Sequence, residues 1–158
     1  MPAGENLNDS TEFKANVKKN TDGEYEMSLA DFRRNNVDLA VKGIHDVIQA
    51  TRPEVVFSIS PAGNNDNNFN RLFADVLKWS REGWTEAIIP QLYFPTGSAE
   101  NSFNHLLHWW AQFTYNNAIF VGYGLYRFDP ASETAAYKTS ENLTNQFAFA
   151  STIRKVQG

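Results

Sequence analysis

Residues 86–94 read EAIIPQLYF and residues 118–126 read AIFVGYGLY, and these two stretches decide the fold class. Both consist mainly of apolar residues, and a shorter apolar run, VVFSI, occupies residues 55–59. Runs of this kind are typical of buried parallel strands. Pro90 lies inside the middle run and cannot donate a backbone hydrogen bond, so we expect it to lack a ladder partner or to lie at a bulge.

The stretches between these runs have the pattern of helices. The runs begin roughly 30 residues apart, which is the length of a βαβ unit, and each interval contains one helical pattern. Strands and helices that alternate in this way form parallel sheets with right-handed crossovers. The sequence therefore predicts an α/β fold built from parallel βα units, with helices on both faces of the sheet.

Capping residues predict where the helices begin and end. Ser28, Asp66, Ser98 and Ser140 each precede an amphipathic segment and are expected to be N-caps. Gly83 is expected to end the second helix in a left-handed conformation. The predicted inward residues of the four helices are Val37, Val41, Ile44 and Ile48; Phe69, Leu72, Phe73 and Val76; Phe103, Leu106, Leu107, Trp110 and Phe113; and Leu143, Phe147 and Ile153.

The composition excludes several classes of protein. The chain has 158 residues, of which 42% are hydrophobic and 14% aromatic, enough for one globular domain with a sizeable core. Its 14 Lys and Arg against 18 Asp and Glu give a net charge of −4. The chain therefore lacks the excess of basic residues that is typical of nucleic-acid-binding proteins. It has no cysteine, and no apolar stretch approaches the ~20 residues of a membrane span.

Polar and aromatic side chains follow each predicted strand. Ser60 and Asn64 come at the end of the first strand, Gln91 and Tyr93 at the end of the second, and Tyr123 at the end of the third. In parallel α/β sheets the loops at the carboxyl ends of the strands converge and carry the functional site. Amides and hydroxyls can bind sugar hydroxyls, and aromatic rings can stack on the apolar face of a sugar. We therefore predict a carbohydrate ligand. At any one position, however, such a residue could equally cap a helix or complete the core.

Motifs for other chemistries are weak or absent. Gly122 and Gly124 resemble part of a dinucleotide-binding fingerprint, but Arg127 occupies the position of its third glycine. The sequence contains no phosphate-binding P-loop and no nucleophile elbow. His105 and His108 are three residues apart on a predicted helix, and without a neighbouring carboxylate we interpret them as surface residues.

Acidic residues are missing from the three strand ends. Hydrolysis of a glycosidic bond usually needs two carboxyl groups beside that bond. Glu86 lies at the start of its strand, and Asp66 and Asp129 are expected to cap helices. Arg33 and Arg34, at a helix start, are expected to pair with nearby acids or a neighbouring loop. The sequence predicts a binding surface without a catalytic residue.

Several of these segments resemble the bacterial glycosyl hydrolase-like 10 domain family. The resemblance covers roughly residues 28–158. It includes an Arg-Arg-x-Asn helix start, a Ser-x-Ser-Pro strand and a Gln-Leu-Tyr strand end. The segments that carry it are SLADFRRNNVDLAVKGIHDVIQATRPEVVFSISPAG, FADVLKWSREGWTEAIIPQLYFP, LLHWWAQF and FVGYGLY.

The resemblance implies a TIM-type barrel of eight strands and an enzyme that hydrolyses glycan strands. One member acts on peptide-free peptidoglycan in the cell envelope. The acidic strand expected to carry the family's catalytic residues, and the strand expected after the last helix, have no counterpart here. We therefore expect strands five to seven of an incomplete barrel, because a full barrel takes about 250 residues. The matching positions imply that Ser60, Gln91, Tyr93 and Tyr123 contact the substrate.

Together these observations predict a polar leader or loop over residues 1–27 and a partial TIM-barrel glycoside hydrolase-like domain over residues 28–158. We expect the intact protein to be a glycoside hydrolase of the cell envelope, periplasm or extracellular space. This chain alone is expected to be inactive. We expect a glycan substrate, with no cofactor, metal, nucleic acid or membrane span.

An alternative is a non-catalytic carbohydrate-binding or assembly module with an open, flavodoxin-like parallel sheet. Such a module could form a homo-oligomer through its exposed sheet edges.

Overall fold

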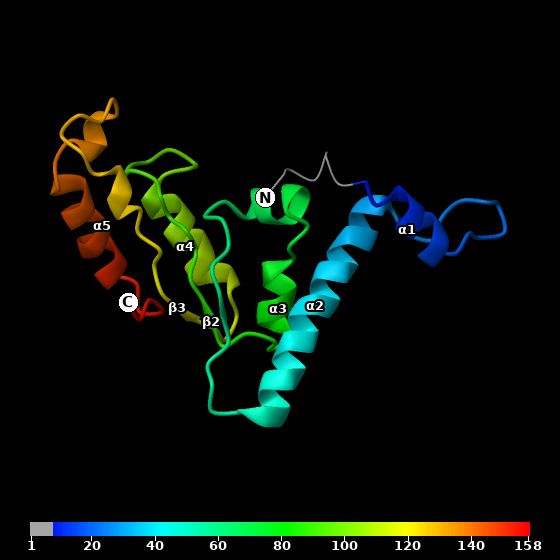
Figure 1. Ribbon diagram of the computed structural model, residues 1–158. Coiled ribbons are helices and arrows are strands. Elements are labelled where there is room, and N and C mark those ends of the chain that lie inside the picture. Colours follow the sequence, from blue (N-terminus) through cyan, green and yellow to red (C-terminus); the bar gives the residue numbers. More distant parts are fainter. Residues whose placement is uncertain (1–7) are drawn as a thin grey trace.

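A computed structural model describes residues 8–158 of the chain (Figure 1). Its three strands, β1 (Ser58–Ile59), β2 (Ala87–Ile88) and β3 (Ala118–Ile119), lie at the centre. The helices are α1 (Ser10–Asn16), α2 (Leu29–Thr51), α3 (Val76–Arg81), α4 (Phe103–Phe113) and α5 (Glu141–Ser151). There is also a π-helical turn, η2 (Asn67–Arg71), and two 3-10 turns, η3 (Leu125–Arg127) and η4 (Ala135–Tyr137). None of the described helices is long and apolar enough to cross a membrane.

The sheet is parallel and its strands follow one another in chain order, β1-β2-β3. Backbone hydrogen bonds continue past the named strands, from Gln91 N to the oxygen of Pro61 (2.9 Å) and from Gly122 N to the oxygen of Pro90 (3.0 Å). Pro90 therefore stays in the ladder as an acceptor. One helix lies between each pair of strands, so the predicted α/β fold of parallel βα units is confirmed, and it is compatible with part of a TIM-type barrel.

Helices cover one face of this sheet. The strand residues in the main core, among them Ile59, Ile88 and Ile119, share one face, since these three are paired across the sheet. Their alternate neighbours, including Ser60 and Phe120, point to the other face and lie outside that core. The expectation that helices cover both faces is therefore wrong for the described residues. Sequential parallel strands with right-handed crossovers place every connecting helix on the same side.

A fourth extended segment lies beside β3. Gln157 N donates to the oxygen of Ile119 (2.8 Å), and Gly158 accepts from Val121 N (2.6 Å). Val156 forms a parallel bridge with Ile119. Residues 156–158 thus extend the hydrogen bonding at β3 through an isolated bridge and do not form a further strand of the three-stranded sheet.

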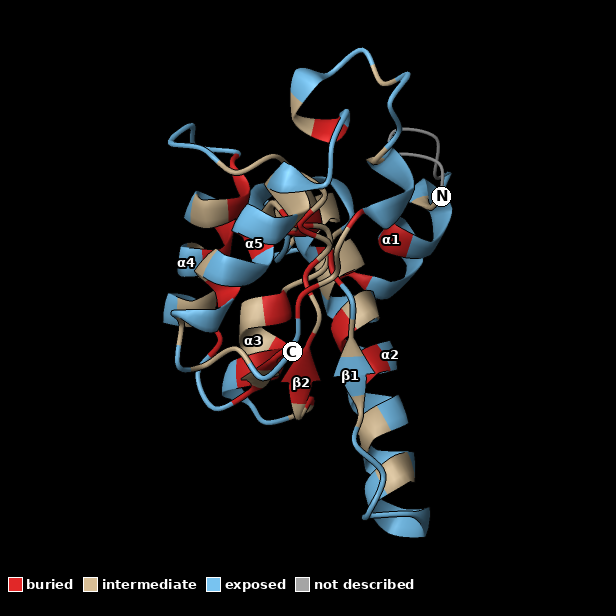
Figure 2. Cartoon of the chain, turned by 90° about the vertical axis from the view of Figure 1, so that its left-hand side faces the viewer, coloured by how far each residue is buried: buried red, intermediate tan, exposed pale blue. Residues whose placement is uncertain are grey.

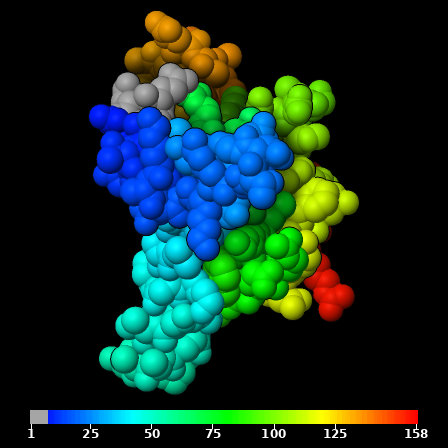
Figure 3. Space-filling view, turned by 90° about the vertical axis from the view of Figure 1, so that its right-hand side faces the viewer, coloured from blue at the N-terminus to red at the C-terminus, as the bar shows by residue number. Residues whose placement is uncertain are grey.

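Helix α2 begins where its capping residues predict. The Ser28 hydroxyl accepts a hydrogen bond from Asp31 N (3.0 Å). The amino half of α2 packs against the core through Val37 and Val41. Ile44, predicted to face inward, is half exposed, because the carboxyl half of α2 projects beyond the other elements (Figures 2 and 3).

The second predicted helix is broken into two pieces. Asp66 makes no capping hydrogen bond, and η2 ends before Phe73, whose φ of 54° cannot continue a helix. A new N-cap, Asp75, then accepts from Lys78 N (3.0 Å) and starts α3. Gly83, with φ 71°, ends α3 as predicted.

Helix α4 begins later than predicted. Its N-cap is Ser102 rather than Ser98, and the Ser102 hydroxyl both accepts from His105 N and donates to the oxygen of Gly97 (2.9 Å). Four of its five predicted core residues are buried, whereas Phe113 is 41% exposed. For α5, Gln146 and Ala150 are buried in place of the predicted Phe147, which is half exposed.

The start of the first strand and the helix expected at Asp129 also differ from the prediction. Val55 and Val56, predicted to be in the first strand, are exposed and precede β1. Asp129 and Pro130 do not begin a helix. Instead, the Asp129 carboxylate accepts from Ala131 N (2.8 Å) and stabilises a turn.

The segment predicted as a polar leader includes α1. Residues 1–7 of that segment lie outside the described residues. Phe13 of α1 packs on Phe32 of α2 and on Tyr25, and these rings form a second, smaller core. Asp9 makes two hydrogen bonds with the Arg33 guanidinium, at 2.7 and 2.8 Å, which secure α1 against α2.

Candidate functional site

A cavity of about 270 Å³ opens where the strands end. Its lining combines side-chain amides, two aromatic rings and one guanidinium. The cavity lies at the carboxyl end of the sheet, where parallel α/β folds bind their ligands. The residues that line it are Ala62, Gly63, Asn64, Asn67, Gln91, Tyr93, Phe94 and Arg127.

Asn68 and Trp110 hold the end of β1 in place. The buried Asn68 amide accepts from Ala62 N (2.9 Å) and donates to the oxygen of Ala62 (2.8 Å), as a neighbouring strand would. Trp110 Nε1, from the buried face of α4, donates to the oxygen of Gly63 (2.7 Å). A Cβ atom at position 63 would lie 2.5 Å from the oxygen of Gln91, so only glycine allows β1 and β2 to approach here.

Two of the predicted site residues meet across the sheet. Gln91 Nε2 donates to the backbone oxygen of Ser60 at 3.1 Å and lies 3.4 Å from the Ser60 hydroxyl. Both side chains are on the sheet face that carries no helix. The contact fixes the Gln91 amide at the edge of the cavity and leaves polar groups of both residues available to a ligand.

Asn64 connects two loops. Its Oδ1 accepts from Asp66 N (2.8 Å), and its Nδ2 donates to Oδ1 of Asn101 (2.7 Å). Asp66 belongs to the loop after β1 and Asn101 to the loop after β2. Asn64 therefore fixes these two loops relative to each other at the cavity wall.

The third side of the cavity is aromatic and cationic. The Tyr93 and Tyr126 rings pack edge to face with centroids 5.8 Å apart, and Tyr126 is 74% exposed. Arg127 Nε lies 3.3 Å from the Tyr126 hydroxyl, and this hydrogen bond raises the pKa of Arg127. The backbone of Tyr93 is held by Tyr137, whose hydroxyl donates to the Tyr93 oxygen (3.1 Å).

Tyr123 lies apart from the other predicted site residues. Its ring stacks on Phe103 of α4 with centroids 5.8 Å apart and packs on Phe147 of α5 at 4.5 Å. Burial raises the pKa of its phenol. The structure thus brings Ser60, Asn64, Gln91 and Tyr93 to one rim and places Tyr123 in the helix layer.

The cavity wall contains no carboxylate among the described residues. Glu86, predicted to lie at the opposite end of the sheet, does so: its Oε2 accepts from Phe57 N (2.8 Å) and its Oε1 from Gln49 (3.3 Å). Asp66, which does not cap a helix, accepts from Asn70 Nδ2 (2.6 Å). The cavity can therefore bind and orient polar ligands, but it lacks a carboxyl group for proton transfer.

The remaining residues singled out from the sequence have separate surroundings. His105 and His108 point to different neighbours, since His108 packs on Phe149 (5.4 Å) and His105 lines a second cavity. Arg33 pairs with Asp9, as predicted for a nearby acid. Arg34 pairs with Asp31 (2.7 Å) and donates to the oxygen of Phe69 (3.2 Å), so it also holds η2 against α2.

Sequence reasoning missed four residues of this site. Asn67, Phe94 and Arg127 line the cavity, and Asn68 positions its wall. The asparagine-rich run at residues 64–70 was a signal for the two asparagines, because a run of amides after a strand suits a polar ligand. The sequence did not point to Arg127 as a site residue. It was noted only because it occupies the third glycine position of the dinucleotide-binding fingerprint.

Comparison with known proteins identifies similar sequences. The model of the glycosyl hydrolase-like 10 family matches residues 1–138, a range that includes the predicted leader. The chain is 32% identical over 124 residues to the glycosyl hydrolase YngK of Bacillus subtilis (strain 168). It is 27% identical over 122 residues to the glycosyl hydrolase DigH of Escherichia coli O6:H1, and 26% identical over 122 residues to DigH of Escherichia coli K12.

The matches cover most of this chain but little of the relatives. The YngK match spans 65% of this chain and 24% of YngK. The DigH match spans 67% of this chain and 28% of DigH. The chain therefore matches about a quarter of the length of these relatives.

Proposed function

The chain belongs to the glycosyl hydrolase-like 10 family, and from this membership and the strand-end cavity we propose that it forms part of the glycan-binding surface of a glycoside hydrolase. The observation that carries the proposal is the cavity wall itself. It joins the Gln91 and Asn64 amides to the Tyr93 ring and the Arg127 guanidinium. Amides bind hydroxyl and acetamido groups, and the ring offers a stacking surface for a sugar.

Arg127 supports an anionic bacterial glycan as the substrate. The guanidinium stays protonated, and its planar group of donors is well suited to bind a carboxylate. Peptidoglycan strands whose peptides have been removed carry a free lactyl carboxylate on every second sugar. We propose such peptide-free strands as the ligand, and the cell envelope as the location of the intact protein.

We propose that this chain binds the glycan without hydrolysing it. Hydrolysis needs two carboxyl groups at the scissile bond, and the described cavity wall offers none. In the intact hydrolase, the role of Ser60, Gln91, Tyr93 and Arg127 would be to hold the sugar in position for carboxylates from another segment. Incubation with peptide-free strands should release no reducing ends above the level of a buffer blank.

Binding can be tested by isothermal titration calorimetry with peptide-free strands and with neutral chito-oligosaccharides. We expect tighter binding of the carboxylate-bearing strands. Tyr93→Ala should weaken binding of both glycans, because the stacking ring is lost. Arg127→Met should weaken only the anionic one, by about tenfold, the size of a lost charge-assisted hydrogen bond.

Arg154→Met serves as the matched control, because Arg154 is an exposed arginine that follows α5 and does not line the cavity. Circular dichroism shows whether each variant is folded. Equal affinity of the wild type and folded Arg127→Met for peptide-free strands would refute the anionic substrate. No binding of either glycan would refute the glycan-binding function.

A non-catalytic binding or assembly module remains the second candidate, favoured by the wall without carboxylates. Its proposed flavodoxin-like sheet has less support, because the described helices all connect on one face, whereas doubly wound folds carry helices on both faces. Light scattering distinguishes an assembly module, which forms a defined oligomer, from a monomeric glycan-binding unit.

A further inference from the structure

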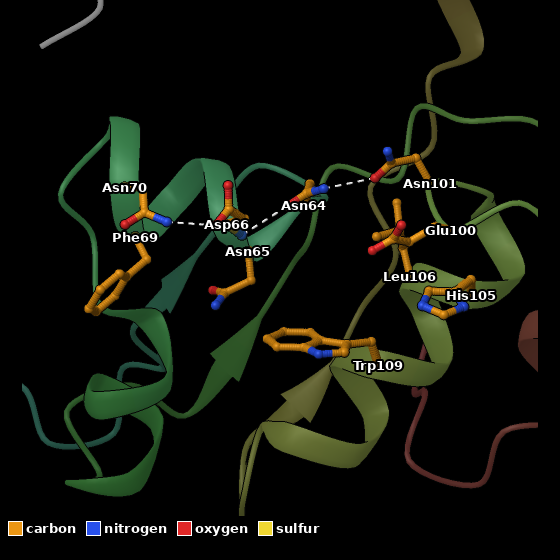
Figure 4. A pocket seen from close by; sticks show the side chains of 10 residues that line it. All are labelled: Asn64, Asn65, Asp66, Phe69, Asn70, Glu100, Asn101, His105, Leu106 and Trp109. Carbon is orange, nitrogen blue, oxygen red and sulfur yellow. Dashed lines mark hydrogen bonds between the residues drawn. The ribbon is translucent and has the colours of Figure 1, made fainter. Parts of the chain in front are cut away.

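A second cavity, of about 360 Å³, lies beside the strand-end site (Figure 4). It is bounded on one side by the loop after β1 and η2, and on the other by the loop after β2 and α4. Asn64 lines both cavities, so the two are adjacent along the same rim. A volume of this size lies within the range of pockets that hold small molecules.

Asn65 presents an unused acceptor at this cavity. Its Oδ1 is shielded from solvent and accepts no hydrogen bond from the protein. In Figure 4 the Asn65 side chain extends from the loop after β1 into the space between the Phe69 ring and the Trp109 indole. An amide oxygen that is buried without a donor costs free energy, and a small rotation of the Asn65 amide into the cavity would let a ligand hydroxyl supply that donor.

Trp109 provides a fixed aromatic surface opposite Asn65. Its indole packs edge to face on Trp110, with centroids 5.1 Å apart, and against Phe113 at 5.0 Å. Trp110 is buried in the core, so the support under Trp109 is rigid. A rigid indole at a polar cavity is a typical platform for the apolar face of a sugar ring.

Carboxylates supply the negative charge at this cavity, and its asparagine amides can both accept and donate hydrogen bonds. The Asp66 and Glu100 carboxylates both line it, and no lysine or arginine does among the described residues. Acceptors of this kind bind hydroxyl donors and repel anions. The charge is therefore opposite to that of the strand-end cavity, which holds Arg127.

We propose that this cavity is a second saccharide subsite, selective for an uncharged sugar unit that stacks on Trp109 and donates a hydroxyl to Asn65. In combination with the strand-end cavity, and on the premise of the proposed function, it would bind the neutral sugar of a strand whose neighbouring sugar carries the carboxylate. The alternation of charge along the rim would then fix the register of the glycan.

Neutral chito-oligosaccharides test the subsite, with tryptophan fluorescence and calorimetry as readouts. We expect saturable quenching in the wild type. Asn65→Ala should weaken binding about fivefold or more, because the buried acceptor is lost, and Trp109→Leu should weaken it about tenfold and remove the quenching. Asn65→Ala removes a side chain whose oxygen accepts no hydrogen bond within the protein, so it tests the site even where Trp109→Leu disturbs folding.

The outcomes separate this inference from the proposed function. Unchanged affinity and quenching in folded Asn65→Ala and Trp109→Leu would overturn the second subsite, even where Tyr93→Ala still weakens binding. Loss of affinity in the Asn65 and Trp109 variants alone would support the subsite, and it would refute the strand-end site if Tyr93→Ala still bound the neutral glycan normally and Arg127→Met still bound peptide-free strands normally. Arg154→Met again controls for general changes.

Discussion

Asp38 shows how one buried carboxylate organises the helix layer. It is 5% exposed and lies on α2, and its two oxygens accept from Lys78 Nζ and from Trp79 Nε1, each at 2.6 Å. Both donors belong to α3, so the carboxylate joins α2 to α3. A buried carboxylate is tolerated only where such partners replace its water.

Replacement of Asp38 should therefore be costly. Asp38→Ala leaves the Trp79 indole N–H without an acceptor and the Lys78 ammonium without its counter-ion. Because Lys78 is partly exposed and can find water, we expect a loss of about 2–4 kcal/mol in the free energy of unfolding. Urea unfolding monitored by tryptophan fluorescence measures this loss. The control is Asp46→Ala on the same helix, whose exposed pair with Lys42 should cost about 0.5 kcal/mol or less.

Among the elements, the sequence predicts helices better than their boundaries. Ser28 is predictable as a cap because Asp31 follows it at the spacing of a capping signal and the residues after it have a helical pattern. The predictions for Asp66 and Ser98 are wrong. Ser102, four residues after Ser98, caps α4, and Asp75 caps α3 after the break at Phe73. The left-handed Phe73 between η2 and α3 had no signal in the sequence, because only tertiary contacts hold a bulky residue there.

The docking of α1 on α2 should depend on pH. The hydrogen bond from the Arg33 guanidinium lowers the pKa of Asp9. A lowered pKa means that the ionised carboxylate is stabilised in the folded chain. The contribution of the Asp9–Arg33 pair to stability is therefore fully present above the ordinary aspartate pKa, and it is lost as the pH falls through the lower pKa of the folded chain. Below about pH 4 we therefore expect residues 10–17 to lose protection from amide exchange before the main core does.

Amide hydrogen exchange measured by mass spectrometry tests this expectation, with labelling times scaled to the intrinsic exchange rate at each pH. Asp9→Asn should expose residues 10–17 to exchange already at pH 7 and should remove the acid dependence. Glu12→Gln, an exposed acid on the same helix, should behave as the wild type. Acid-induced opening that persists unchanged in Asp9→Asn would contradict the role of Asp9.

At the scale of the whole molecule, chain order explains which part of the site was predictable. The ends of parallel strands meet at one edge, so Ser60, Asn64, Gln91 and Tyr93 could be grouped without knowledge of the structure. The sequence did not predict that the strand alternation turns Tyr123 towards α4 and α5. The side that the helices leave free also depends on strand order, which hydrophobic patterns do not specify.

The free face of the sheet gives the last prediction. Phe120 and Val121 are neighbours beside β3, but Phe120 is 39% exposed on the free face and Val121 is 8% exposed against the helices. Phe120→Asp should cost about 1–2 kcal/mol, the partial burial of its ring. Val121→Asp places a charge between the sheet and the helices, and its cost of several kcal/mol is comparable with the whole stability of a small domain.

Circular dichroism melts should thus show a folded Phe120→Asp chain and a largely unfolded Val121→Asp chain. Equal destabilisation by the two changes would mean that the free face is covered in solution, either by another copy of the chain or by a rearranged segment.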